Sequence, residues 1–225
     1  MNERAPQRRS SVVSYLELRR GIGIIGTVLP FLLVLGNAFL RSVLLSPPRW
    51  RGWGLQPSMS SYYYTAMGNV FIGALCVIGV FLISYKGYDR KDAWAGTISG
   101  FAAVGVGLFP IWEPNGPMTV IGGCHVVFAA ILYLTLAYFS LFLFPRGKGA
   151  PGRRKILRNR VFRICGCAIL ACIVGIAVVS IPSVRKQVAA MDLVFWLECG
   201  ATIAFGISWL TKGQRIFRDT APTSD

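Results

Sequence analysis

Three residues in this chain are of types that could support chemistry. His125 is the only histidine and stands near the start of a long apolar segment, and Glu198 stands inside another. A histidine and a carboxylate within hydrogen-bond reach can exchange protons, and an imidazole can activate a serine hydroxyl as a nucleophile. Ser60, in the stretch QPSMSSYYY, is the serine that could take this role. His125, Glu198 and Ser60 are therefore the candidate catalytic residues, provided that the fold brings them together.

The same residues also have two simpler interpretations. They could bind a ligand or line a transport path, together with Asn69 and Glu113, which the sequence places near the same level. Alternatively, His125 and Glu198 could bond each other or backbone carbonyls and hold their helices in register. Ionisable groups inside apolar segments face the protein interior or a wet cavity. We favour the structural role, with binding next and catalysis last.

Metal binding is not expected. Zinc hydrolases draw several ligands from histidine and acidic residues, and one histidine cannot supply them. The six cysteines all fall inside apolar segments, where a thiol behaves as a small hydrophobe. A disulfide is the less favoured interpretation for the outermost pair, Cys124 and Cys199, and we expect no cofactor. The cysteines are Cys76, Cys124, Cys165, Cys167, Cys172 and Cys199.

These candidates must be positioned by helices that cross a membrane. The 225 residues are 54% hydrophobic and only 15% charged, which is too apolar for an ordinary soluble domain. A hydrocarbon core about 30 Å thick needs roughly 20 apolar residues in a helix. Six segments approach that length: 21–40, 66–85, 94–112, 122–144, 164–181 and 193–210. We predict an all-α bundle of six transmembrane helices over residues 21–210, flanked by a basic N-terminal segment (1–20) and a tail (211–225).

The basic residues fall mainly in alternate loops of such a bundle. Of the 24 Lys and Arg residues, 19 lie in the N-terminal segment, the second loop, the fourth loop with the start of its helix, or the C-terminal tail. Basic residues are retained on the cytoplasmic side, so we expect a protein of the cytoplasmic (plasma) membrane with both termini in the cytoplasm. This distribution accounts for the net charge of +15 without a nucleic-acid partner. The exceptions are Arg41, Arg49, Arg51, Arg185 and Lys186.

A basic cluster, GRRKILRNRVFR, precedes the fifth expected span. Each basic residue near a membrane surface attracts anionic lipid by about 1 kcal/mol. We therefore expect anionic headgroups as partners at the cytoplasmic face. Before the first span, SVVSYLELRR is expected to form a short interfacial helix. The residues expected to bind headgroups are Arg153, Arg154, Lys155, Arg158 and Arg160.

The third expected span is rich in small residues. Small residues on one face let helices approach closely in lipid, so we expect this span at the centre of the bundle. Pro110 should end it, and Asp92 is expected to cap its start. The small residues at four-residue spacing are Ala95, Ser99, Ala103 and Gly107.

Several short motifs accompany this pattern. An outer loop carries QPSMSSYYY, the second span has Asn69 and Gly73, and the third span closes at Pro110. The fourth span opens with the lone His125, followed four residues later by an Ala-Ala pair. In this order of motifs, over about residues 21–210, the chain resembles the FRAG/DRAM/Sfk family of six-span membrane proteins and its bacterial relatives of unknown function.

That resemblance implies six spans and a role around membrane lipids or the processing of GPI lipids, without a defined reaction. Eukaryotic members have a Pro-x-Ile-Ser-Asp-like stretch after the first span. Here it corresponds to Pro57-Ser58-Met59-Ser60, with Ser61 where the acid is expected. The acid of that stretch is therefore missing from this chain.

Together these patterns favour a non-enzymatic membrane protein that binds or organises lipid. One alternative is a small-solute or proton-coupled transporter, which needs a wet path continuing past Glu198 to the cytoplasmic side. The other is a lipid-modifying enzyme with an outer-leaflet polar site built from His125, Glu198 and Ser60. The first hypothesis leads because of the basic inner face, the polar outer layer and the lack of an assembled catalytic set. No strong polar residues mark a path through the inner halves, which counts against a transporter.

Overall fold

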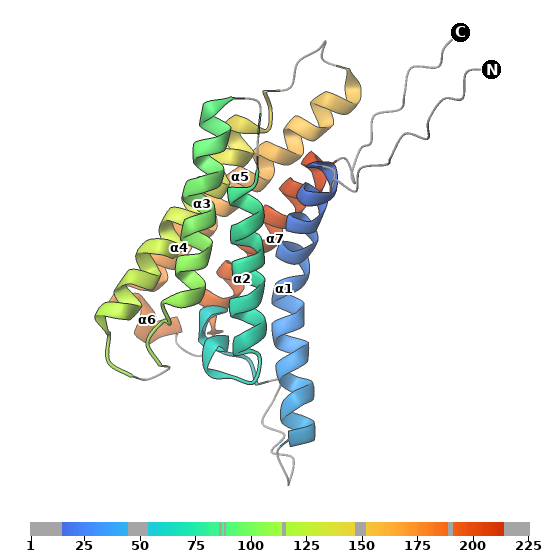
Figure 1. Cartoon of the computed structure of the whole chain (residues 1–225). Coiled ribbons are helices and arrows are strands. Elements are labelled where there is room, and N and C mark those ends of the chain that lie inside the picture. The colour runs from blue at the N-terminus through green and yellow to red at the C-terminus, as the bar shows by residue number, and fades with distance from the viewer. Residues whose placement is uncertain are drawn as a thin grey trace, which may run out of the picture.

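The fold is helical throughout the described part of the chain (Figure 1). The structure, a computed structural model, describes residues 15–44, 54–85, 87, 89–113, 116–146, 152–188 and 191–213. The elements are α1 (Tyr15–Leu44), the 3₁₀ helix η1 (Ser60–Tyr64), α2 (Gly68–Ile83), α3 (Arg90–Leu108), α4 (Val120–Tyr138), the π-helical turn η2 (Phe139–Leu143), α5 (Arg153–Val179), α6 (Pro182–Val188) and α7 (Leu193–Lys212).

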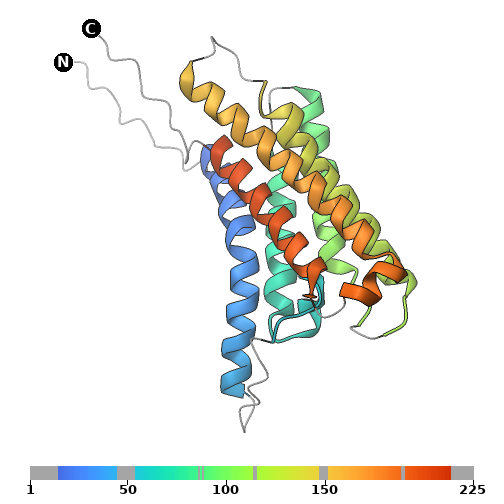
Figure 2. The same cartoon turned by 180° about the vertical axis from the view of Figure 1, so that it is seen from behind.

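The six long helices form a closed ring. Going round it, α1 packs on α2, α2 on α3, α3 on α4, α4 on α5, and α5 on α7, which returns to α1. Figures 1 and 2 show the two sides of this ring, with α2 and α3 facing the reader in the first and α5 and α7 in the second. The first and last long helices are therefore neighbours.

The described chain starts and finishes at one end of the ring. The guanidinium of Arg20 donates to the carbonyl of Gly213 at 3.0 Å, which joins the beginning of α1 to the end of α7. We call this the basic end, and the opposite end, where η1 lies, the η1 end (Figure 1). Among the described residues, only Arg41, Arg185 and Lys186 carry positive charge toward the η1 end. Those toward the basic end are Arg19, Arg20, Arg90, Lys91, Arg146, Arg153, Arg154, Lys155, Arg158, Arg160, Arg163 and Lys212.

The length and composition of four helical segments suit a membrane. Those long and apolar enough to cross one are Leu16–Val43, Val120–Leu143, Arg153–Val179 and Leu193–Lys212. Large side chains also point outward, with Phe39 66%, Phe101 63% and Ile164 67% exposed. An apolar outer surface suits lipid rather than water. The prediction of an all-α membrane protein is therefore confirmed at this level.

Two of the six expected spans do not reach the length and hydropathy of a membrane-crossing helix. α2 is apolar but has 16 residues. α3 has 19 residues, yet it begins with Arg90, Lys91 and Asp92 and is then filled largely by glycine and alanine, which lowers its hydropathy. Both stand in the ring beside the four longer helices (Figure 1).

Several helix boundaries differ from the prediction because charged turns continue the spans. Residues 15–20, expected in a separate interfacial helix, are the first turns of α1, while Val12 and Val13 lie outside the described residues. The basic cluster likewise forms the first turns of α5, which starts at Arg153 rather than at 164. Charged residues are good helix formers, and hydropathy detects only the portion of a helix that lies in lipid.

The cap of α3 also differs from the prediction. Asp89 is the N-cap, and its side chain accepts from the backbone N–H groups of Lys91 and Asp92 at 3.0 and 3.1 Å. Asp92 completes a capping box, because its side chain accepts from the N–H of Asp89 at 3.3 Å. Asp92 therefore supports the start of α3 from its third position.

The predicted central position of α3 is wrong. α3 is one member of the ring, packed between α2 and α4. Its small residues do serve close packing: a Cβ on Gly100 would lie 2.6 Å from the carbonyl oxygen of Gly79 on α2. The face of small residues therefore correctly indicated that α3 packs closely against another helix. It did not indicate how many helices surround α3 or which ones they are.

The interior of the ring is filled differently along its length. At the η1 end, two side chains are buried between the helices: Met59, the N-cap of η1, and Tyr62 within η1. At the basic end, Tyr85, Phe139 and Trp209 form an aromatic cluster with ring centroids 5.1–5.6 Å apart. Between these two layers lies a cavity of about 50 Å³. Hydrophobic side chains fill most of the interior, so a polar group buried there requires a hydrogen-bond partner.

Candidate functional site

The candidate site is built around η1, which α1 holds at its entrance. Asn37, 1% exposed, donates from its amide to the carbonyl of Gly54 at 3.0 Å. Gly54 has a φ of +63°, and a Cβ there would meet the Arg41 guanidinium, so the turn requires glycine. The hydroxyls of Ser58 and Ser61 then bond each other at 2.8 Å across the start of η1. The chain is thereby turned inward, and Ser60 is carried into the ring.

His125 is buried on α4 and both of its ring nitrogens are engaged. Nδ1 lies 2.6 Å from the carbonyl oxygen of Phe109, and Nε2 lies 2.9 Å from the hydroxyl of Ser60. A carbonyl can only accept, so Nδ1 carries the proton. In the neutral ring Nε2 is then the acceptor, and Ser60 donates to it. The Phe109 carbonyl therefore fixes the imidazole tautomer in which Nε2 accepts a hydrogen bond from the Ser60 hydroxyl.

Glu198 reaches η1 from α7 on the other side of Ser60. Its Oε2 accepts from the backbone N–H of Met59 at 2.6 Å, and the N–H of Ser60 also bonds this carboxylate. Ser60 thus links the two candidates, with its hydroxyl on His125 and its amide on Glu198. We call Ser60, His125 and Glu198 the outer polar cluster. The three candidate catalytic residues are brought together.

Two further residues extend this cluster toward the cavity. Tyr133 donates its hydroxyl to that of Thr202 at 2.8 Å, and Thr202 donates in turn to the backbone carbonyl of Glu198 at 2.8 Å. Tyr133, Thr202, Ser60 and Glu198 are the polar members of an otherwise mostly apolar cavity wall. Sequence reasoning missed Tyr133 and Thr202. Helical spacing could have found them, because Thr202 stands one turn beyond Glu198 and Tyr133 about two turns beyond His125.

The Ser60–His125 pair has the geometry of a nucleophile and its base, but the surroundings oppose acyl transfer. That reaction needs hydrogen-bond donors aimed at the oxyanion that forms beside the serine. The nearest backbone donors, the N–H groups of Met59 and Ser60, are already bonded to Glu198. In addition, His125 is oriented by a neutral carbonyl, which carries no charge to stabilise an imidazolium. In this conformation the cluster joins η1 to α4 and α7.

The other two candidate ligand residues lie elsewhere. Asn69 is exposed at the start of α2, and Glu113 is exposed in the segment after α3. Neither lines the cavity beside Ser60. The structure therefore places Asn69 and Glu113 on the exposed surface, apart from the buried outer polar cluster, and their role in ligand binding stays a prediction.

Metal and disulfide chemistry have no structural counterpart in the described segments. Within them there is no group of three or more His, Cys, Asp or Glu side chains that could hold a metal ion. Cys124 and Cys199 are free thiols rather than a disulfide, as are the other four cysteines.

Buried polar residues also lie at the basic end, which sequence reasoning missed. Asp92 is 1% exposed. The ammonium of Lys212 donates to the carbonyl of Phe144 at 3.3 Å and lies 5.1 Å from the centre of that ring. Ser140 and Ser208 share a buried hydrogen bond of 2.8 Å. Asp92, which is buried, and Lys212, which is half-buried, stand just outside the expected spans, so their enclosure could not be anticipated.

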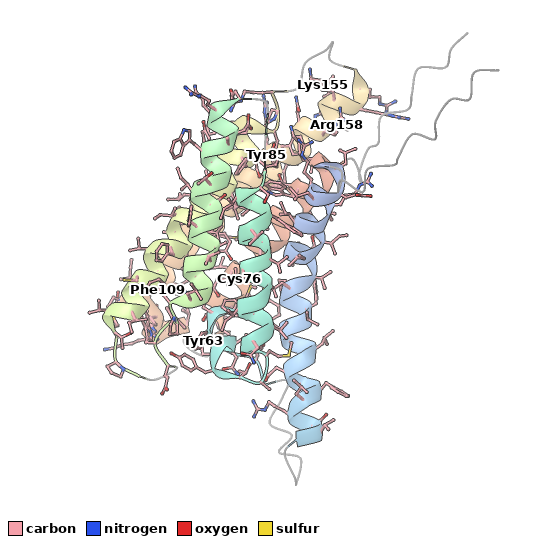
Figure 3. All side chains as sticks on the ribbon, viewed as in Figure 1. Tyr63, Cys76, Tyr85, Phe109, Lys155 and Arg158 are labelled. Carbon is pink, nitrogen blue, oxygen red and sulfur yellow. The ribbon has the colours of Figure 1, made fainter. Side chains whose placement is uncertain are left out.

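The basic cluster predicted to meet anionic headgroups is helical and lies at the basic end. Figure 3 shows Lys155 and Arg158 on the first turns of α5, far from Phe109 and Tyr63 at the η1 end. Arg153, Arg154 and Arg160 are exposed there. The outer polar cluster and the basic cluster therefore occupy opposite ends of the bundle.

Comparisons with protein families, with curated proteins and with solved structures find no match for this chain.

Proposed function

We propose that this chain is a six-span, non-enzymatic protein of the plasma membrane that binds or organises lipid, with both termini in the cytoplasm. The observation that carries the proposal is the concentration of positive charge at one end of a helical ring with an apolar outer surface. Cytoplasmic ends of membrane helices retain Lys and Arg, and the same residues attract anionic headgroups. α2 and α3 count as spans in this proposal because they stand in one ring with the four longer helices.

The interior supports this proposal over transport. The cavity beside Glu198 has about 50 Å³, enough for a few water molecules but not for an organic solute. Met59 and Tyr62 cover it toward the η1 end, and Tyr85, Phe139 and Trp209 fill the ring toward the basic end. A transporter would need both layers to open. The resemblance to the FRAG/DRAM/Sfk family agrees with a lipid-related role and belongs to the same proposal.

Lipid binding can be tested by the lipids that the protein retains. The wild-type protein is extracted into nanodiscs from membranes of known composition, and the bound lipids are quantified against the bulk. We expect anionic phospholipids to be enriched, and the enrichment to fall when Arg153, Arg154 and Arg160 are all changed to Gln. Retention of lipids in the bulk proportions by the wild-type protein would contradict the proposal.

A lipid-modifying enzyme is the second candidate, favoured by the 2.9 Å contact between Ser60 and His125. A fluorophosphonate probe separates the two functions because it labels only activated serines. We expect no labelling of the native protein. Labelling that disappears in both Ser60→Ala and His125→Ala, together with fatty-acid release from phospholipid vesicles, would establish the enzyme instead.

A further inference from the structure

An open groove lies between α3 and α4 at the basic end. It has a volume of about 460 Å³. It opens on the outer surface of the ring, so it is separate from the outer polar cluster and from the basic turns of α5. The residues that line it are Arg90, Lys91, Trp94, Ala95, Ile98, Leu134, Thr135 and Tyr138.

The lining changes in character with depth. Arg90 and Lys91 come from the first turn of α3 and are exposed at the rim. One turn further along α3 stands Trp94, 66% exposed, and one turn beyond it Ile98, 47% exposed. At 1.5 Å per residue, Lys91 and Ile98 are separated by roughly 10 Å along the helix. The groove thus passes from cations through an aromatic ring to aliphatic side chains.

The facing wall on α4 follows the same order. Tyr138, 39% exposed, stands nearer the basic end, and Leu134, 51% exposed, lies one turn deeper. Aromatic rings with a polar edge prefer the headgroup zone of a bilayer, and aliphatic side chains prefer the hydrocarbon. A phospholipid has the same sequence of groups, with a phosphate above an ester region and acyl chains below.

The local charges favour an anion at the rim. Asp89, the exposed acidic residue directly before Arg90, forms an ion pair with Arg146 at 3.0 Å. Asp92, in the same first turn, is 1% exposed and takes part in the capping box inside the ring. Among the described residues, the surface carboxylate beside the rim is thus paired with Arg146, and the positive charges of Arg90 and Lys91 are presented to the groove.

We infer that this groove is a binding site for one anionic phospholipid, with its phosphate at Arg90 and Lys91 and an acyl chain along Ile98 and Leu134. The inference rests on the proposed lipid-binding function and makes it specific: the basic turns of α5 attract anionic lipid in general, whereas the groove holds a single molecule. A neutral phospholipid has the chains but lacks the net charge, and it binds more weakly.

The test is native mass spectrometry of the full-length protein in detergent, titrated with phosphatidylglycerol or with phosphatidylcholine. We expect one saturable phosphatidylglycerol per protein, bound at least tenfold more tightly than phosphatidylcholine. The double variant Arg90→Gln/Lys91→Gln should lose this preference, a weakening of about 10- to 30-fold for two phosphate contacts. The matched control is Arg185→Gln/Lys186→Gln, an adjacent basic pair at the η1 end.

A second variant tests the shape of the groove without changing its charge. Ile98→Trp/Leu134→Trp fills the aliphatic part and should weaken phosphatidylglycerol and phosphatidylcholine alike. The inference is overturned if the control pair weakens binding as much as the groove pair, or if no saturable stoichiometry exists. If anionic lipids are still enriched in nanodiscs in that case, the lipid-binding function stands and only the groove is wrong; loss of both results removes both proposals.

Discussion

His125 depends on a backbone carbonyl more than on any charged neighbour. Phe109 lies at the end of α3, where its carbonyl is not used within the helix, and it holds Nδ1 at 2.6 Å. The opposite nitrogen is thereby committed to Ser60. His125 thus connects two segments, the end of α3 through Phe109 and η1 through Ser60, and this connection explains its position.

The Ser60–His125 bond should contribute measurably to stability. His125→Ala leaves the buried hydroxyl of Ser60 and the partly buried carbonyl of Phe109 without their partner. The desolvation penalty of a buried unpaired group is about 1–3 kcal/mol. We expect Ser60→Ala, His125→Ala and the double variant to show a coupling energy of about 1 kcal/mol in SDS-induced unfolding. Val126→Ala, at an outward-facing neighbour on α4, is the control and should leave the unfolding midpoint nearly unchanged. Additive single effects would contradict the bond.

Ionisation of Tyr62 in η1 should destabilise the fold at alkaline pH. Burial raises the pKa of its phenol to about 12, from an ordinary value of 10.0. The unfolded chain therefore releases this proton first, and the free energy of unfolding falls as pH rises from 10 toward 12, by up to about 1.4 kcal/mol per pH unit. Below pH 10 the group has no effect.

The Tyr62→Phe variant removes this ionisation and should flatten the decline. Unfolding is measured at a series of pH values between 9 and about 12, with Tyr63→Phe as the control because Tyr63 is only partly buried. Equal slopes for the wild type and Tyr62→Phe would show that η1 does not shield the phenol from solvent.

Pairs of helices in this ring touch through glycine. A Cβ on Gly206 of α7 would collide with the hydroxyl of Thr27 on α1 and lie 2.6 Å from its backbone nitrogen. Gly100 of α3 is equally tight against Gly79 and Ile83 of α2. Backbone atoms cannot move aside as a flexible side chain can, so these contacts fix how close the helices come.

Alanine at these positions should separate the helices. Gly206→Ala and Gly100→Ala are each expected to lower the free energy of unfolding by about 1–3 kcal/mol, the usual range for overpacking. Gly73→Ala is the control, because a Cβ there meets nothing within 4 Å and alanine favours the helix. If Gly73→Ala is as damaging as the other two, helix propensity rather than close approach governs all three sites.

The sequence was sufficient to locate the long apolar helices but not to predict which helices pack against each other. Hydropathy located the spans of α1, α4, α5 and α7, since each is apolar over a bilayer's width. It could not place α3, because a face of small residues fits any close partner, and it could not extend α5 back to Arg153, because a charged turn has no hydropathy signal. His125, Glu198 and Ser60 were identified by rarity and residue type. Their connection through η1 depends on a loop turning inward, which Gly54 and Asn37 achieve through a local geometry that has no periodic pattern.

At the scale of the whole molecule, charge separates the two ends. This asymmetry predicts which end faces the cytoplasm. We expect a cysteine introduced as Arg185→Cys on α6 to react with an impermeant maleimide on intact cells, and one introduced as Arg153→Cys on α5 to react only after permeabilisation. Comparison with the unmodified protein accounts for its own thiols. The reverse pattern would invert the orientation and assign the basic end to the other leaflet.

The pairing of α1 with α7 bears on how the protein is made. A ribosome delivers α1 and η1 before α7, so η1 enters a ring of helices that is still open on the side where α7 will lie. Glu198, which bonds the amides of Met59 and Ser60, arrives only with α7. A nascent chain cut short before α7 would therefore hold the inserted loop only through α1 and α4, by the bonds of Asn37 and His125. Synthesis of α7 then supplies the third helix that fixes η1 in the interior.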